Sequence, residues 1–259
     1  MYLNSLMGRF FLCVFLLAPT TASAALPLIT DDMGTQGKGK FQLETSGTWL
    51  TDEENEASGN VRKTSSLATV IFTAGITETL DVMVTVPYVW TKTNESGKDT
   101  RDSGISDTLL EAKWRFYDKQ KFSFAIKPGI LIPSGDADNG LGTDHVGYSA
   151  VLISTVDAEP WFFDANLGYL YLPNSSGDRT NIWLGSLASR FAIAERWKIV
   201  GEIGAARNTD STDSSYPVFA QIGLIYSPRD YLDLSAGYLF GLNNAAVDQS
   251  VRAGVTVRF

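Results

Sequence analysis

Cysteine and histidine are almost absent from this chain, which has one of each among 259 residues. Cys13 lies in a segment that we expect to be removed during export, and Leu12 before it is too large for a lipoprotein cleavage site. We therefore predict a mature protein without a thiol. That prediction excludes disulfides, a cysteine nucleophile and a thiolate metal site.

Basic residues are fewer than acidic ones, and long apolar runs are missing. The chain has 21 Lys and Arg against 29 Asp and Glu, a net charge of −8. Because nucleic acids repel an acidic surface, we expect no nucleic-acid partner. No segment has eighteen consecutive apolar residues, so the sequence predicts no transmembrane helix. Aromatic residues make up 12% of the chain and helical periodicity is scarce, which favours strands.

The first residues have the order of a secretory signal peptide. Arg9 precedes an apolar run at 10–18, and the small residues Ala22-Ser23-Ala24 follow. The run is too short to span a bilayer as a helix, which needs roughly twenty residues. We predict cleavage after Ala24, with Ala25 as the near alternative. A retained membrane anchor is the less favoured interpretation.

Most of the remaining sequence alternates with period two, which in a strand places one set of side chains on each face. The last segment shows this best. One face carries Val251, Ala253, Val255, Val257 and Phe259, and the other carries Arg252, Gly254, Thr256 and Arg258. Aromatic residues also gather at segment ends, as in the girdles of transmembrane barrels.

The spacing of these segments predicts an all-β fold, a transmembrane antiparallel up-and-down β-barrel of about twelve strands. Strands are expected near 39–50, 64–75, 80–93, 105–117, 122–133, 146–156, 161–172, 180–193, 197–208, 216–226, 232–240 and 249–259. Long loops, including 51–62 and 94–104, alternate with short turns, so both termini lie on one side. The predicted organisation is a signal peptide at 1–24, a periplasmic or lumenal segment at 25–38 and the barrel at 39–259.

Charged residues on the second face identify the lumen, because Arg or Lys facing lipid at the midplane costs about 2–4 kcal/mol. The predicted lumen residues are Lys113, Arg115, Glu111, Asp107, Lys127, Glu44, Asp164, Glu202 and Arg252, with Lys113 and Arg115 as the first candidates. The charges could pair and fill a narrow barrel, or they could line a polar path. Twelve strands lie between filled eight-stranded barrels and open sixteen-stranded ones, so both interpretations stay open.

Few residues suggest chemistry beyond transport. His145 and Ser149 are four apart, about 13 Å along a strand, which is too far for a base and nucleophile. The acidic stretch at 135–144 lacks EF-hand spacing and fits turn chemistry better. We therefore expect neither an enzyme nor a cofactor.

Five stretches resemble the outer-membrane family known as MetA-pathway of phenol degradation: 29–44, 104–116, 133–136, 140–143 and 254–259. The resemblance covers nearly the whole mature chain and implies a barrel transporter of aromatic or other poorly soluble compounds. It brings no established binding residues.

The sequence therefore predicts an outer-membrane channel or uptake protein for small solutes, aromatic or hydrophobic compounds among them. Its other expected partners are outer-membrane lipid and the outer-membrane assembly machinery. A closed structural or surface-interaction barrel is the alternative, and a barrel hydrolase is the least favoured one.

Overall fold

The computed structural model describes residues 26–56, 59–95 and 98–259, so the predicted signal peptide lies outside the described residues. The described chain is built from strands and connections. The strands are β1 (Phe41–Glu56), β2 (Gly59–Gly75), β3 (Leu80–Glu95), β4 (Lys98–Ile105), β5 (Thr108–Lys119), β6 (Phe122–Ile132), β7 (Gly147–Ala158), β8 (Trp161–Tyr171), β9 (Asn181–Ala194), β10 (Trp197–Ala206), β11 (Val218–Arg229), β12 (Leu232–Gly241) and β13 (Gln249–Arg258).

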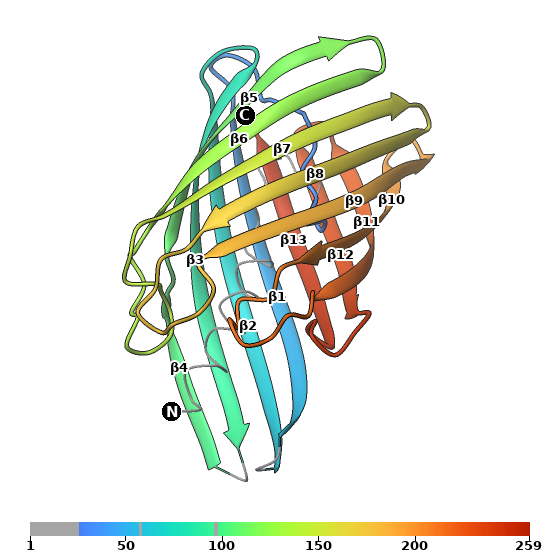
Figure 1. Cartoon of the computed structure of the whole chain (residues 1–259). Coiled ribbons are helices and arrows are strands. Elements are labelled where there is room, and N and C mark those ends of the chain that lie inside the picture. Colours follow the sequence, from blue (N-terminus) through green and yellow to red (C-terminus); the bar gives the residue numbers. More distant parts are fainter. Residues whose placement is uncertain (1–25, 57–58, 96–97) are drawn as a thin grey trace.

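Antiparallel pairing closes these strands into a barrel of twelve positions (Figure 1). Except for β4 and β5, strands that are adjacent in sequence pair with each other, and β13 returns to pair with β1. β4 and β5 both pair with β3 and form one continuous wall position, interrupted at Ser106 and Asp107. Within the closed part of the barrel no sheet edge is free, which is the condition for crossing lipid with strands, whereas β4 pairs with β3 alone in the projecting hairpin. The predicted fold and strand count are confirmed.

Alternation along each strand sorts apolar side chains outward and polar ones inward. In β2, Phe72 is 40% exposed and faces outward, whereas Ile71 is 2% exposed and faces the lumen. Arg190 turns inward on β9, and Trp183 and Leu187 face outward. The outer face is therefore a continuous apolar surface that suits lipid.

The two ends of the barrel differ. The end that holds the short turns and the C-terminus is called here the turn end, and the opposite end is the loop end (Figure 1). Aromatic pairs mark both boundaries: the ring centroids of Tyr88 and Trp90 lie 4.5 Å apart towards the loop end, and those of Trp197 and Tyr226 lie 4.4 Å apart at the turn end. Such girdles place amphipathic rings at a membrane–water boundary.

The predictions of loops at 51–62 and 94–104 were wrong. β1 and β2 stay paired out to Glu56 and Gly59, and β3 and β4 out to Glu95 and Lys98, so both hairpins project beyond the rest of the barrel (Figure 1). Among the described residues, no helix is long and apolar enough to cross a membrane.

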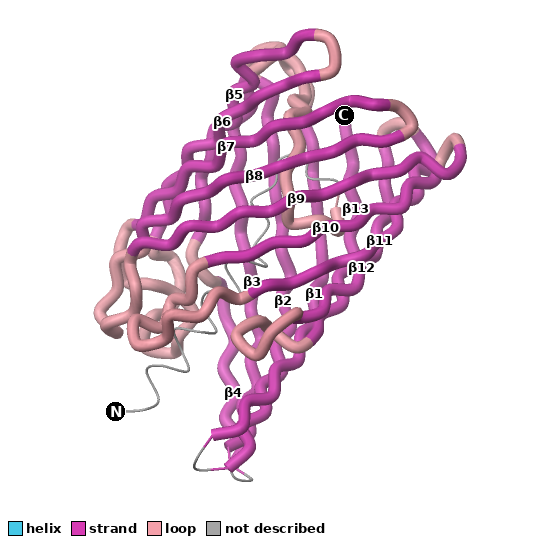
Figure 2. The backbone as a smooth tube through the Cα atoms, turned by 45° about the vertical axis from the view of Figure 1, so that its right-hand side comes forward, coloured by secondary structure: helices cyan, strands magenta, loops and turns pink. Residues whose placement is uncertain are grey.

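Residues 26–40 enter the barrel from the turn end and run between its walls (Figure 2). The entry is tight: Gly37 and Gly39 have positive φ angles of 85° and 76°, and Gly39 N–H donates to the carbonyl of Gly75. A left-handed backbone is easiest for glycine, which explains the Gly-Lys-Gly spacing at this bend. Residues 26–40 therefore lie against the inner face of the barrel.

Candidate functional site

The structure places the predicted lumen residues in three different surroundings. The buried ones that project inward from strands are Glu44, Glu111, Lys113, Lys127, Asp164, Glu202 and Arg252. Arg115 is less buried; its guanidinium reaches the carbonyl of Glu78 and the sulfur of Met33 near the turn end. Asp107, between β4 and β5, contacts a loop instead of the central charges.

Asp31 of the N-terminal segment is the centre of these charges. Its carboxylate lies 3.0 Å from Lys113 Nζ and 2.8 Å from Lys127 Nζ, and all three side chains are fully buried. Lys127 also lies 3.5 Å from Glu111. Buried ammonium groups are costly unless they are paired, so Asp31 and the two lysines stabilise one another's burial. The segment therefore completes a charge network that the wall alone leaves unfinished.

Asp32 makes a second connection to the wall, through Arg190 of β9. The guanidinium lies 2.8 Å from Asp32 and 2.9 Å from Asp164 on β8, so it bridges the segment and the barrel. Thr155 donates to Asp164 and orients that carboxylate. A planar guanidinium with several donors suits such a double contact better than an ammonium group.

Glu202 of β10 binds the backbone of the segment. Its carboxylate accepts hydrogen bonds from Ile29 N–H and Thr30 N–H, both at 2.8 Å, and from the Thr30 hydroxyl at 2.7 Å. The neighbouring Leu28 packs in an apolar cluster with wall residues of β10 and β11, among them Val200. The segment is held by charge, by backbone hydrogen bonds and by apolar burial together.

The start of the described chain is seated in a hollow made by glycines. A Cβ atom at Gly223 or Gly237 would lie 2.5 or 2.6 Å from Pro27 Cγ, and one at Gly254 would lie 2.7 Å from Leu26. These positions belong to the adjacent strands β11, β12 and β13. Only glycine leaves room there for the segment.

Towards the loop end the lumen becomes apolar. Ile29 joins a buried cluster with wall side chains and with two loop residues, Leu141 and Val247, that reach it from different loops. The wall members are Leu50, Leu67, Val89, Phe219 and Leu239. The lumen is therefore covered twice, by the N-terminal segment at the charged level and by loop side chains above it.

Asp107 fixes the loop that carries Leu141. Its carboxylate accepts hydrogen bonds from Gly135 N–H at 3.0 Å, Thr143 N–H at 2.8 Å and the Thr143 hydroxyl at 2.9 Å. His145 in the same loop contacts the carbonyl of Thr143.

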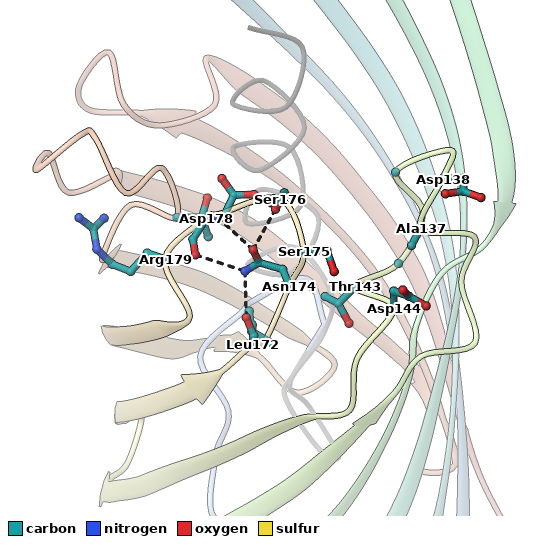
Figure 3. A pocket seen from close by; sticks show the side chains of 13 residues that line it. Ala137, Asp138, Thr143, Asp144, Leu172, Asn174, Ser175, Ser176, Asp178 and Arg179 are labelled. Carbon is teal, nitrogen blue, oxygen red and sulfur yellow. Dashed lines mark hydrogen bonds between the residues drawn. The ribbon is translucent and has the colours of Figure 1, made fainter. Parts of the chain in front are cut away.

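A pocket opens between this loop and the one that joins β8 to β9 (Figure 3). Asn174 organises its second wall, because its side chain donates to the carbonyls of Leu172 and Asp178 and accepts from Ser176. The Arg179 guanidinium donates to carbonyls of the loop at 208–213. Among the described residues, no group of three or more His, Cys, Asp or Glu side chains is placed to hold a metal ion.

Sequence reasoning missed Asp31, Asp32 and Arg190 as site residues. One signal could have identified the segment: four residues in a row after the predicted cleavage region, Leu26-Pro27-Leu28-Ile29, are apolar and need burial. The two aspartates that follow them face a lumen whose predicted charges include two lysines. The pairing itself depends on three-dimensional placement.

A closed antiparallel barrel with an apolar outer face and an inner face rich in paired charges defines a transmembrane β-barrel of the outer-membrane type. The chain belongs to the family described as "Putative MetA-pathway of phenol degradation", whose model matches residues 27–259. No curated protein matches the sequence.

Solved structures of similar fold are outer-membrane barrels. The COG4313 outer membrane channel from Pseudomonas putida F1 has a TM-score of 0.70 and 12% identity, covering 88% of this chain and 98% of that one. The KdgM porin has a TM-score of 0.59 and 9% identity, covering 84% and 99%. The translocator domain of the autotransporter NalP from Neisseria meningitidis has a TM-score of 0.56 and 12% identity, covering 88% and 91%. At these identities the likeness establishes the fold alone.

Proposed function

We propose that the protein is an outer-membrane channel for uptake of small solutes, including aromatic or hydrophobic ones, and that residues 26–37 close it at rest. The observation that carries this proposal is the way in which residues 26–37 are held inside the lumen. The segment is held by ion pairs and hydrogen bonds, and after removal of the signal peptide it would join the barrel at one end only, so it could leave without unpairing any strand. Family membership and the likeness of the fold to an outer membrane channel and a porin support it.

The proposal includes the location. Export through a cleaved signal peptide at 1–24 would deliver the chain to the periplasm, where the assembly machinery would insert it into outer-membrane lipid. The loop end would face outward and the turn end the periplasm, as short turns and long loops are arranged in such barrels.

Planar-bilayer conductance of the refolded mature protein tests the function. We expect rare openings for the wild type, frequent openings for Asp31→Asn, and steady conductance when residues 26–36 are deleted. Asp31→Asn removes the charge that pairs with Lys113 and Lys127. Asp138→Asn, in an exposed loop, is the matched control and should behave as the wild type.

The same recordings address the predicted lumen residues. In the deletion protein, replacing Lys113 and Arg115 by Gln should change ion selectivity, because both side chains would then face an open path. Unchanged conductance and selectivity would contradict their role. Silence of every variant would favour the closed structural barrel, which the complete burial of Lys113 and Lys127 also fits. Phospholipid hydrolysis lost in His145→Ala would favour the hydrolase.

A further inference from the structure

The hollow that holds Pro27 has the features of a binding site for a small ring-bearing molecule. Pro27 places a five-membered ring against two glycines, Gly223 on β11 and Gly237 on β12, which are direct partners across the two strands. Either glycine, given a Cβ, would collide with the ring. The wall therefore contains a ring-sized depression at a buried lumen position.

Two donors converge on the carbonyl oxygen beside that ring. Gln221 Nε2 donates to Pro27 O at 2.6 Å, and the Arg252 guanidinium donates to it at 3.2 Å. Both side chains are almost completely buried, at 5% and 2% exposure. A carboxylate at the same place supplies a negative charge and a second acceptor oxygen, so it matches this donor pair better than the peptide group does.

An acceptor lies next to the donors. Glu202 on β10 pairs directly with Gln221 on β11, and it accepts the N–H and O–H donors of Ile29 and Thr30. A ligand that carries a hydroxyl group on its ring would present a similar donor on this side. The site thus offers a flat hollow, a cationic donor pair and a neighbouring carboxylate acceptor.

We propose that this site binds small aromatic carboxylates, ring-hydroxylated ones included, when the N-terminal segment withdraws, and that Pro27 occupies the ligand's place in the resting protein. The proposal rests on the proposed uptake function, since the segment has to leave, and it names the class of solute taken up. Ligand and segment compete for one site, so a suitable solute would itself favour the open state.

The test uses the full mature chain carrying Asp31→Asn, which loosens the segment and leaves the site residues unchanged. Three probes of nearly equal size are compared: benzoate, neutral benzyl alcohol and cationic benzylamine. Binding is measured by ligand-observed NMR and, separately, by block of channel current. We expect benzoate to bind at least about tenfold more tightly than either of the others, since a hydrogen-bonded charge pair is worth that much.

Two variants locate the binding. Arg252→Gln should abolish the preference for benzoate over benzyl alcohol, and Gln221→Leu, which keeps the charge, should weaken benzoate binding severalfold. Arg258→Gln on the same strand is the control, because its guanidinium contacts Gln42 and Asp233 at the turn end. If Arg252→Gln fails to fold, the loss of benzoate affinity in Gln221→Leu still tests the site.

Equal affinity for the three probes, or benzoate binding unchanged in the folded site variants, would overturn the proposal. A conducting channel without benzoate preference would refute the site and leave the uptake function standing. Benzoate binding without conductance would support the site and refute the uptake function. If the protein neither binds benzoate nor conducts, both proposals are contradicted.

Discussion

At the scale of single residues, the lumen is organised by groups that serve two partners. Arg190 is the clearest case, because one guanidinium bridges Asp32 of the segment and Asp164 of the wall and also lies over the Phe162 ring, 5.4 Å from its centroid. An ammonium group has no planar fork and cannot make all these contacts at once. Each such residue couples the segment to the barrel.

Replacing Arg190 should therefore destabilise the folded barrel in a graded way. We expect Arg190→Lys to keep part of the pairing and Arg190→Met to lose about 3 kcal/mol of unfolding free energy, because two buried carboxylates remain without their partner. Urea unfolding of the refolded protein in lipid vesicles measures both. The control is Arg258→Met, whose ion pair with Asp233 is more exposed and is worth about 1 kcal/mol or less. Equal losses at the two sites would contradict the bridging role.

At the scale of elements, the sequence predicted the parts of the strands that contact lipid and missed the strand extensions beyond the membrane. Alternation exists where one face is apolar and the other is polar. Beyond the membrane boundary the described side chains of the β3–β4 hairpin are at least partly exposed on both faces, so polar residues such as Lys92 and Asp99 pair there without any apolar period. Two strand extensions were therefore taken for loops.

The contacts of the N-terminal segment could not be predicted, for a different reason. Parity along strands identified the inward charges Glu111, Lys113 and Lys127, since lipid excludes charge. Their partner Asp31 lies outside any strand and has no periodic signal, and its position follows only from the closed barrel around it. The N-terminal segment therefore determines which wall residues form a site, and alternation along strands cannot detect this segment.

The glycine hollow gives this element a sharp test. Gly237→Val should expel the segment, because the added side chain would overlap Pro27. Maleimide labelling of Leu28→Cys, a position 1% exposed, should then accelerate at least about tenfold, as an overlap costing more than 1.4 kcal/mol implies. Gly201→Val is the control, since its Cβ would meet nothing closer than 3.6 Å. Similar rates in the two variants would show that the hollow does not seat the segment.

At the scale of the whole molecule, the two covers of the lumen lie in series. The N-terminal segment closes the charged level, and Leu141 and Val247 join the apolar cluster towards the loop end. When two constrictions lie in series, the narrower one limits the current. Removal of one of them therefore leaves the current limited by the other. Ile29 belongs to the apolar cluster as well, which ties the two covers together.

This arrangement predicts a definite order of single-channel conductance. Leu141→Ala with Val247→Ala should stay close to silent while the segment is in place, because the ion-paired level remains shut. Deletion of residues 26–36 should give a conducting but restricted channel, and the combination should conduct more than the deletion alone. Planar-bilayer recordings of the three proteins at one salt concentration decide the order. Conductance in the loop variant with an intact segment would mean that the segment leaves a path open, and the lumen would then be gated at the loop end alone.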